Sequence, residues 1–133
     1  MSQIFQSAYW GLVDFIGFFT RKWAFFRSKA VDMSSPKVAE VKNIIGSGKV
    51  VIFSKTYCPY CKLAKEVFDK IKEKYTTVEL DLRDDGEEIQ GILGEITGAR
   101  TVPRVFVNGK FVGGGSDVKS LYEKGELQTL VAA

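Results

Sequence analysis

Two cysteines in a Cys-Pro-Tyr-Cys motif at residues 58–61 have the clearest capacity for chemistry in this chain. The motif follows a run of four apolar residues that predicts a buried strand, and Pro59 favours the first turn of a helix, where a proline loses no hydrogen bond. The unpaired N–H groups and the dipole of a helix start stabilise a thiolate. We therefore expect Cys58 to be an exposed nucleophile, with Lys55 adding positive charge. Cys61, about one turn into the helix, should be a more shielded resolving partner.

The number of cysteines excludes most functions other than redox chemistry for this pair. The 133-residue chain has two cysteines and no histidine, so one chain cannot complete a Cys/His zinc site, and a secreted disulfide scaffold would need more cysteines. Two chains could still share a metal or a cluster. A net charge of +3 is too small to indicate nucleic-acid binding. A redox role for the pair is the favoured interpretation.

The first 33 residues differ in composition from the rest of the chain. Aromatic and aliphatic residues recur there at spacings of three and four, which is typical of one face of an amphipathic helix, and basic residues outnumber acidic ones. Its uninterrupted apolar runs, among them residues 15–19, are too short to span a bilayer. Three interpretations stay open: a helix on a membrane surface, an organelle-targeting segment, or an appended segment that packs on the domain or is disordered. Met33 precedes a Ser-Ser-Pro linker and could serve as an alternative start.

Residues 34–133 predict one α/β domain. The expected order is helix, strand, helix, strand, helix, strand, strand, helix, with a final helical turn or two after Gly125. The strand–helix–strand unit implies a parallel pair, and Asn108-Gly109 between apolar runs predicts a hairpin. The sheet should therefore mix a parallel pair with an antiparallel hairpin. Cys58 would lie at the carboxyl end of a parallel strand, where open α/β sheets place ligand sites. The strands are expected at residues 50–54, 77–82, 104–107 and 110–112.

Some local details of these elements are also predicted by pattern. In the strand at 77–82, alternate residues, among them Leu82, should face the core. Asp85 should cap the next helix, with Glu88 completing a capping box, and Gly98 should end it. Tyr60 is expected on the inner face of the helix that follows Cys58.

The order of elements together with the motif at residues 58–61 resembles the glutaredoxin family over about residues 36–131. The resemblance rests on motifs in register: Lys55, the Cys-Pro-Tyr-Cys motif, Thr101-Val102-Pro103, and the glycine-rich turn that ends in Ser116-Asp117. Thioredoxins carry Trp-Cys-Gly-Pro-Cys instead. The resemblance implies a thioredoxin-like fold, in which a four-stranded mixed sheet is flanked by helices, for the domain at 34–133, preceded by the amphipathic extension at 1–33.

The resemblance also implies an activity, that of a glutathione-dependent thiol–disulfide oxidoreductase. Such an enzyme reduces protein–glutathione mixed disulfides and protein disulfides, with Cys58 as nucleophile and Cys61 as resolving thiol. Glutathione would be the reducing co-substrate, and glutathione reductase would act indirectly through it. No resident metal is expected. We expect a monomer in the cytoplasm, with a mitochondrial or membrane-associated location, set by residues 1–33, as the alternative.

A glutathione site follows from the same resemblance. Val102 would offer its backbone N–H and C=O to the bound thiol peptide, next to Pro103 in the cis form. Lys55 and Gln90 would meet the glycyl carboxylate, while the helix start at residues 115–117 and the Asp117 carboxylate would meet the γ-glutamyl end. The expected contacts are Lys55, Tyr60, Gln90, Thr101, Val102, Pro103, Gly115, Ser116 and Asp117.

An iron–sulfur protein is the alternative from another functional class. Some glutaredoxins bind a bridging cluster as dimers, through the first cysteine and glutathione. Cluster-binding members often replace the proline that corresponds to Pro59, so its presence here disfavours that reading.

Overall fold

The structure is a computed structural model that describes residues 31–133, and Asp32–Ala133 form one compact unit. The expectation for an amphipathic segment at 1–33 therefore concerns residues that lie almost entirely outside the described part. In chain order the elements are α2 (Pro36–Ile45), β1 (Val50–Ser54), α3 (Pro59–Lys70), β2 (Thr76–Glu79), the 3₁₀ helix η1 (Leu80–Leu82), α4 (Gly86–Thr97), β3 (Arg104–Val107), β4 (Lys110–Gly113), α5 (Gly115–Glu123) and α6 (Glu126–Ala132).

The four strands form one mixed sheet in the order β2-β1-β3-β4. β1 pairs with β2 in parallel and with β3 in antiparallel register, and β3 pairs with β4 in antiparallel register. Asn108 and Gly109 join β3 to β4 with φ values of 52° and 80°, the left-handed conformation that a two-residue hairpin turn of type I′ requires. The predicted mixed sheet and thioredoxin-like α/β fold are confirmed.

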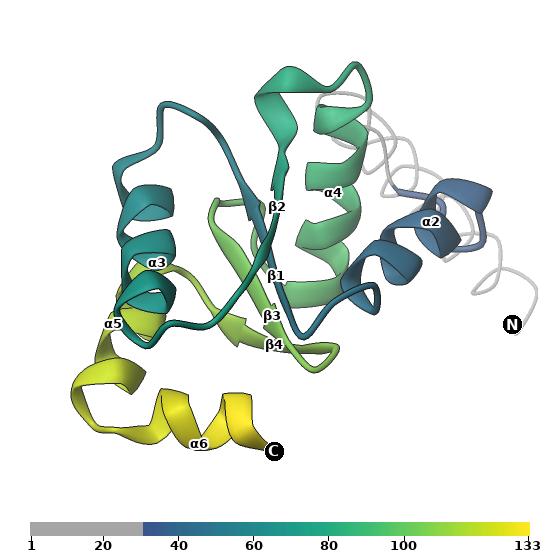
Figure 1. The fold of residues 1–133 in the computed structure, drawn as a ribbon. Helices are drawn as coiled ribbons and strands as arrows, with labels where there is room; N and C mark the ends of the chain where they lie inside the picture. Colours follow the sequence, from purple (N-terminus) through teal and green to yellow (C-terminus); the bar gives the residue numbers. More distant parts are fainter. Residues whose placement is uncertain (1–30) are drawn as a thin grey trace, which may run out of the picture. The chain divides into compact units, whose positions relative to one another are not determined.

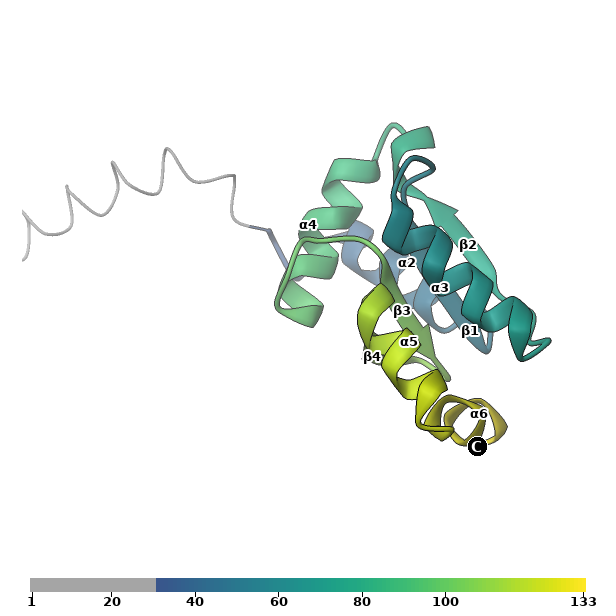
Figure 2. The same ribbon diagram turned by 90° about the vertical axis from the view of Figure 1, so that its left-hand side faces the viewer.

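Helices cover both faces of this sheet. Figures 1 and 2 show α3 and α5 on one face and α2 and α4 on the other. Because β1 lies between two strands and two helical layers, every one of its residues from Val50 to Ser54 is buried. This explains its continuous apolar sequence, since a strand covered on both faces shows no alternation. The core cluster on the α3 side contains Val50, Ile52, Ala64, Val67, Phe68, Val105, Val107, Val118, Leu127 and Val131.

The second strand is shorter than the alternation of apolar residues predicts. β2 ends at Glu79, the residue that pairs with the last residue of β1, Ser54. Beyond that point the chain has no partner strand and turns into η1. The expectation that Leu82 faces the core is wrong, because its side chain is 73% exposed. The alternation of apolar residues in the sequence continues beyond the end of the paired strands, where it no longer predicts which side chains face the core.

The start of α4 also differs from the predicted capping box. Asp85 occupies the N-cap position but directs its carboxylate to Arg83 Nε at 2.7 Å and to Lys37 Nζ at 2.9 Å. Two cations attract a carboxylate more strongly than the helix N–H groups do, which accounts for the difference. The capping box with Glu88 is therefore wrong, whereas Gly98 ends α4 as expected, with a φ of 89°.

Candidate active site around two cysteines

The two cysteines lie at the start of α3 with very different exposure. Cys58 is the N-cap residue and Pro59 begins the helix, so the thiol of Cys58 is placed beside the unpaired N–H groups of the first turn. Both cysteines are free thiols, with Cys58 half-buried and Cys61 fully buried. This agrees with the expected exposed thiol and shielded partner. Figure 1 shows the loop that joins the end of β1 to the start of α3.

The environment of Cys61 favours the protonated thiol. Burial, together with a hydrogen bond to the Cys58 side chain, raises the pKa of Cys61 to about 12. A backbone hydrogen bond from Lys55 and the positive charge of Lys65 act in the opposite direction. At neutral pH Cys61 is therefore a thiol, and Cys58 is the cysteine that a substrate can reach.

The loop before β3 faces the Cys58 thiol. The peptide bond between Val102 and Pro103 is cis, as the family resemblance implies, and Pro103 is buried. The Sγ atom of Cys58 lies 3.8 Å from the carbonyl oxygen of Val102, within the range for a weak hydrogen bond donated by the thiol. Backbone groups of this loop are thus available beside the reactive sulfur.

The segment that enters the motif is held by Asp81, which the sequence reasoning missed. The Cys58 N–H donates to the carbonyl oxygen of Lys55 at 3.1 Å, which forms a tight turn. The N–H of Thr56 donates to Asp81 at 3.0 Å, and the Thr56 hydroxyl donates to the same carboxylate. The parallel register of the structure explains the pairing, because it places Ser54 opposite Glu79 and so brings together the residues two further along each chain; the sequence alone does not give this register.

The N-terminus of α5 lies against the first turn of α3. A Cβ atom on Gly115 would lie 2.6 Å from the carbonyl oxygen of Tyr60, so only glycine fits this approach. A Cβ on Gly114 would lie 3.5 Å from the carbonyl oxygen of Pro103. The carboxylate of Asp117 accepts a hydrogen bond from the Gly114 N–H at 2.9 Å. The helix start, the cis-proline loop and the cysteine motif therefore border one another.

Tyr60 does not belong to the inner face of α3, contrary to expectation. Its side chain is 60% exposed, and Cys61 takes the buried position in this turn. The inner face of the helix continues through Ala64, Val67 and Phe68, which follow Cys61 at helical spacing. An aromatic residue beside a reactive thiol thus remains at the surface, where it can cover a bound ligand.

The other predicted glutathione contacts lie on α4, on the loop that follows it and in the first turn of α5. The Gln90 side-chain amide on α4 donates a hydrogen bond to the carbonyl oxygen of Arg100, so it anchors the loop that leads to Thr101. Thr101 and Ser116 are exposed. The structure thus brings Lys55, Tyr60, Val102, Pro103 and Gly115 into the immediate surroundings of the cysteines and places Gln90, Thr101, Ser116 and Asp117 on the adjoining elements.

A polar network beneath α3 was also missed by the sequence reasoning. The fully buried Ser54 and the side chain of Lys65 both hydrogen-bond to the carboxylate of Glu79, each at 2.6 Å. The sequence placed Ser54 as the last strand residue and gave no reason to pair it with a charge. Among residues 31–133, no group of three or more His, Cys, Asp or Glu side chains is arranged to hold a metal ion.

Comparisons with known proteins give consistent matches to this domain. The family model described as Glutaredoxin matches residues 50–112. Glutaredoxin-C4 of Arabidopsis thaliana is 56% identical over 98 residues, which cover 74% of this chain and 73% of the relative. The human protein named glutaredoxin-2, mitochondrial, is 43% identical over 104 residues, covering 78% of this chain and 63% of that protein. The crystal structure of a buckwheat glutaredoxin–glutathione complex matches with a TM-score of 0.69 and 40% identity, covering 71% of this chain and 86% of that chain.

Proposed function

The chain belongs to the glutaredoxin family and is a glutathione-dependent thiol–disulfide oxidoreductase, and we propose that Cys58 is its nucleophile and Cys61 its resolving thiol. One observation carries the assignment: Cys58 lies half-exposed at the N-terminus of α3, whereas Cys61, one turn on, is fully buried. A nucleophile must be reached from outside, while a resolving thiol needs only to reach its neighbour.

Two reactions follow from this arrangement. In the first, the Cys58 thiolate attacks the glutathione sulfur of a protein–glutathione mixed disulfide, the protein thiol leaves, and a second glutathione releases the one held on Cys58. Only Cys58 is needed for this route. In the second, Cys58 attacks a protein disulfide, and Cys61 then attacks Cys58 to release the substrate and close the intramolecular disulfide.

We propose that glutathione binds along the rim formed by the cis-proline loop and the two helix starts. The carbonyl oxygen of Val102, 3.8 Å from the Cys58 sulfur, supports an extended backbone pairing with the bound peptide. The first turn of α5 offers N–H groups for the γ-glutamyl carboxylate, and Asp117 offers a charge for its ammonium. The remaining proposed contacts are Lys55, Gln90 on α4, and Thr101 in the loop that follows α4.

The test is the reduction of a glutathione mixed disulfide of a small thiol, coupled to glutathione and its NADPH-dependent reductase. Cys58→Ser should abolish turnover, while Cys61→Ser should retain it because the first route does not use Cys61. With a protein disulfide as substrate and with glutathione and dithiothreitol both left out, neither variant should release the reduced substrate. Robust turnover of the mixed disulfide by Cys58→Ser would exclude Cys58 as the nucleophile.

Two further expectations stay predictions that other measurements decide. A cluster-bridged dimer would give coloured protein that loses its visible absorbance on oxidation, and would elute as a dimer in size-exclusion chromatography; we expect colourless monomer.

For the cellular location, the human relative is named mitochondrial, which supports a mitochondrial location as the alternative to the cytoplasm. Among the helices of residues 31–133, none is long and apolar enough to cross a membrane. Imaging of a fluorescent fusion with and without residues 1–33 would separate these locations.

A further inference from the structure

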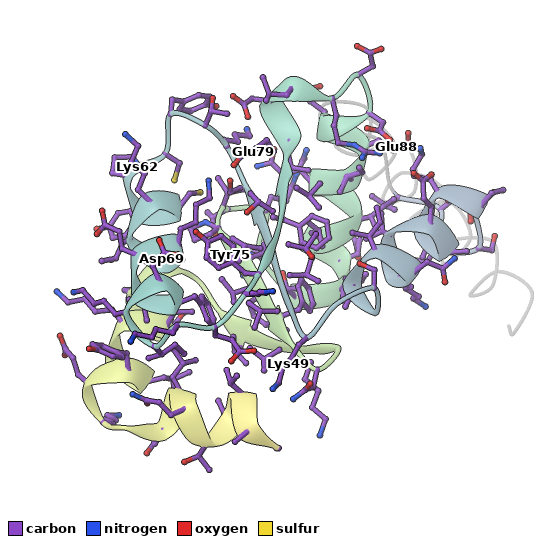
Figure 3. All side chains as sticks on the ribbon, viewed as in Figure 1. Lys49, Lys62, Asp69, Tyr75, Glu79 and Glu88 are labelled. Carbon is purple, nitrogen blue, oxygen red and sulfur yellow. The ribbon has the colours of Figure 1, made fainter. Side chains whose placement is uncertain are left out.

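Ser54, Glu79 and Lys65 form a hydrogen-bonded chain at the ends of β1 and β2, beneath α3. The two oxygens of the Glu79 carboxylate are used separately, one by the Ser54 hydroxyl and one by the Lys65 ammonium, each at 2.6 Å. The side chains of Lys65 and Glu79 are only 24% and 19% exposed. Figure 3 shows Glu79 beside β2, on the side of the sheet that α3 covers. Because Lys65 is hydrogen-bonded to Glu79 and little exposed, its ammonium group is held in one position.

The ammonium so fixed lies on the same helix as the buried cysteine. Lys65 follows Cys61 by four residues on α3, so the two side chains share one face of the helix, one turn apart. The positive charge of Lys65 favours the thiolate form of Cys61. The backbone N–H of Lys55, the residue after Ser54, contacts the same sulfur. The thiolate form of Cys61 is thus stabilised by the Lys65 charge on α3 and by the Lys55 N–H after the end of β1.

The balance of charges at Cys61 changes once Cys58 holds a substrate. In the free protein, burial and Cys58 both oppose the Cys61 thiolate. In a mixed disulfide the Cys58 sulfur is bonded to another sulfur and carries neither a charge nor a proton, so its contribution ends. Burial still opposes the thiolate, and the Lys65 charge and the Lys55 N–H are then the groups that favour it.

Resting on the proposed roles of the two cysteines, we propose that Lys65, held by Glu79 and Ser54, is a positioning residue for the resolving step. In that step the Cys61 thiol gives its proton to solvent, and its sulfur forms a bond to the Sγ atom of Cys58. The bond between Cys58 and the substrate sulfur breaks, and the departing sulfur takes up a proton. A thiol and a disulfide are exchanged without net oxidation.

Other charged or titratable groups on α3 and the neighbouring elements bear on the pH dependence of the resolving step. Cys58 is neutralised in the mixed disulfide, and Glu79 is paired with Lys65. Asp117, on the neighbouring α5, is hydrogen-bonded to the Gly114 N–H. Lys62 lies on the outer face of α3 and is exposed (Figure 3). Lys62 therefore provides a control with the same charge, on the same helix, one residue from Cys61.

The experiment times the resolving step alone. Reduced full-length protein is mixed with oxidised glutathione to form the Cys58–glutathione adduct, and its conversion to the Cys58–Cys61 disulfide is followed by acid quench and mass spectrometry over a series of pH values. Lys65→Met should move the midpoint of the rate profile upward by about one pH unit, so that conversion below the midpoint is about tenfold slower. Lys65→Arg should restore the native profile, and Lys62→Met should leave it unchanged.

Separate readouts distinguish this inference from the proposed function. In a Cys61→Ser background, Lys65→Met should not alter release of the adduct by added glutathione, because that route bypasses Cys61. If the native protein forms no adduct or never converts it, the roles of the cysteines fail. If the native protein converts it and Lys65→Met has the same pH profile, the role of Lys65 alone is overturned.

A second variant guards against loss of folding. Lys65→Met leaves the Glu79 carboxylate without its cation, which could destabilise the domain. Combining Lys65→Met with Glu79→Gln removes the unpaired carboxylate and keeps an acceptor for Ser54. This double variant should still resolve the adduct more slowly than native protein, since Lys65 and not Glu79 is the charge that acts on Cys61. A native pH profile in the folded double variant would also overturn the proposal.

Discussion

The carboxylate of Asp81 accepts two hydrogen bonds from Thr56, one from its backbone N–H at 3.0 Å and one from its hydroxyl. These bonds join the segment that enters the cysteine motif to η1, at the point where β1 and β2 cease to pair. Because Thr56 lies between Lys55 and the motif, Asp81 sets the position of the loop that presents Cys58. The reactive thiol thus depends on a residue that makes no contact with it.

We predict that Asp81→Ala lowers turnover of a glutathione mixed disulfide by about tenfold, since misplacing a reacting group by ~1 Å can reduce a rate by up to about a hundredfold. Asp81→Asn should lose less, because its amide oxygen can still accept one of the two bonds. Asp84→Asn, at an exposed position three residues on, is the control and should keep full activity. Equal turnover by the native protein and Asp81→Ala would show that the loop keeps its position without Asp81.

Arg104 positions the cis-proline loop from the side of the sheet. Its Nε donates to the carbonyl oxygen of Thr101 at 2.7 Å, its other nitrogens reach the hydroxyls of Thr101 and Thr97, and its guanidinium lies 5.0 Å from the centre of the Phe111 ring. Burial lowers the pKa of Arg104, and the charge of Asp117 partly opposes this effect. Lysine cannot reproduce this planar set of bonds.

Arg104→Lys should therefore raise KM for a glutathione mixed disulfide by about tenfold, the equivalent of about 1.4 kcal/mol, with a smaller change in kcat. The reason is that the loop carrying Val102 would lose its anchor while the two cysteines stay in place. Arg83→Lys, at an exposed site, serves as the control in the same steady-state assay. A change confined to kcat would mean that Arg104 acts on the chemical step and not on binding.

Gly86 allows the close packing of α4 against η1. A Cβ atom at this position would lie 1.9 Å from the carbonyl oxygen of Leu80, an overlap that only a backbone shift can relieve. Gly86→Ala should destabilise the domain by about 2–3 kcal/mol and lower Tm by about 10 °C or more. Gly46→Ala is the matched control, because its φ of −85° suits any residue and its nearest neighbour would be 3.7 Å away. Thermal unfolding followed by circular dichroism measures both, and the control should be neutral or slightly stabilised.

The sequence was sufficient for the parts of this protein that depend on local pattern. The apolar run of β1, Pro59 at the helix start and the Asn108-Gly109 turn each specify their own conformation, and together they determine the order of elements. The family resemblance then supplied the cis bond before Pro103, which no local pattern in these residues would predict. The two cysteines needed no structure to be recognised, because their spacing and their place after a strand already indicated their chemistry.

Features that depend on contacts between distant segments were not predicted. Leu82 continues an alternating pattern, but its exposure depends on where β1 ends, which lies 28 residues earlier in the chain. Asp85 has the sequence context of a helix cap, yet Lys37 from α2 competes for it. The Ser54–Glu79–Lys65 network and the Asp81–Thr56 bonds depend on the register between β1 and β2. Such pairings become visible only when that register is known.

Asp85 provides the clearest pH dependence of stability. The hydrogen bonds from Arg83 and Lys37 hold the pKa of Asp85 well below its ordinary value of 3.8 in the folded protein. A carboxyl with a lowered folded pKa stabilises the fold above its unfolded pKa, and this contribution is lost as the pH falls through the folded value. Native protein and Asp85→Asn should therefore differ in their urea midpoints at pH 7, with native protein more stable, and the difference should shrink progressively below about pH 4. Asp84→Asn should track native protein throughout. A gap that stays constant down to pH 2 would mean that Asp85 stabilises the junction of α2 and α4 through packing and not through its charge.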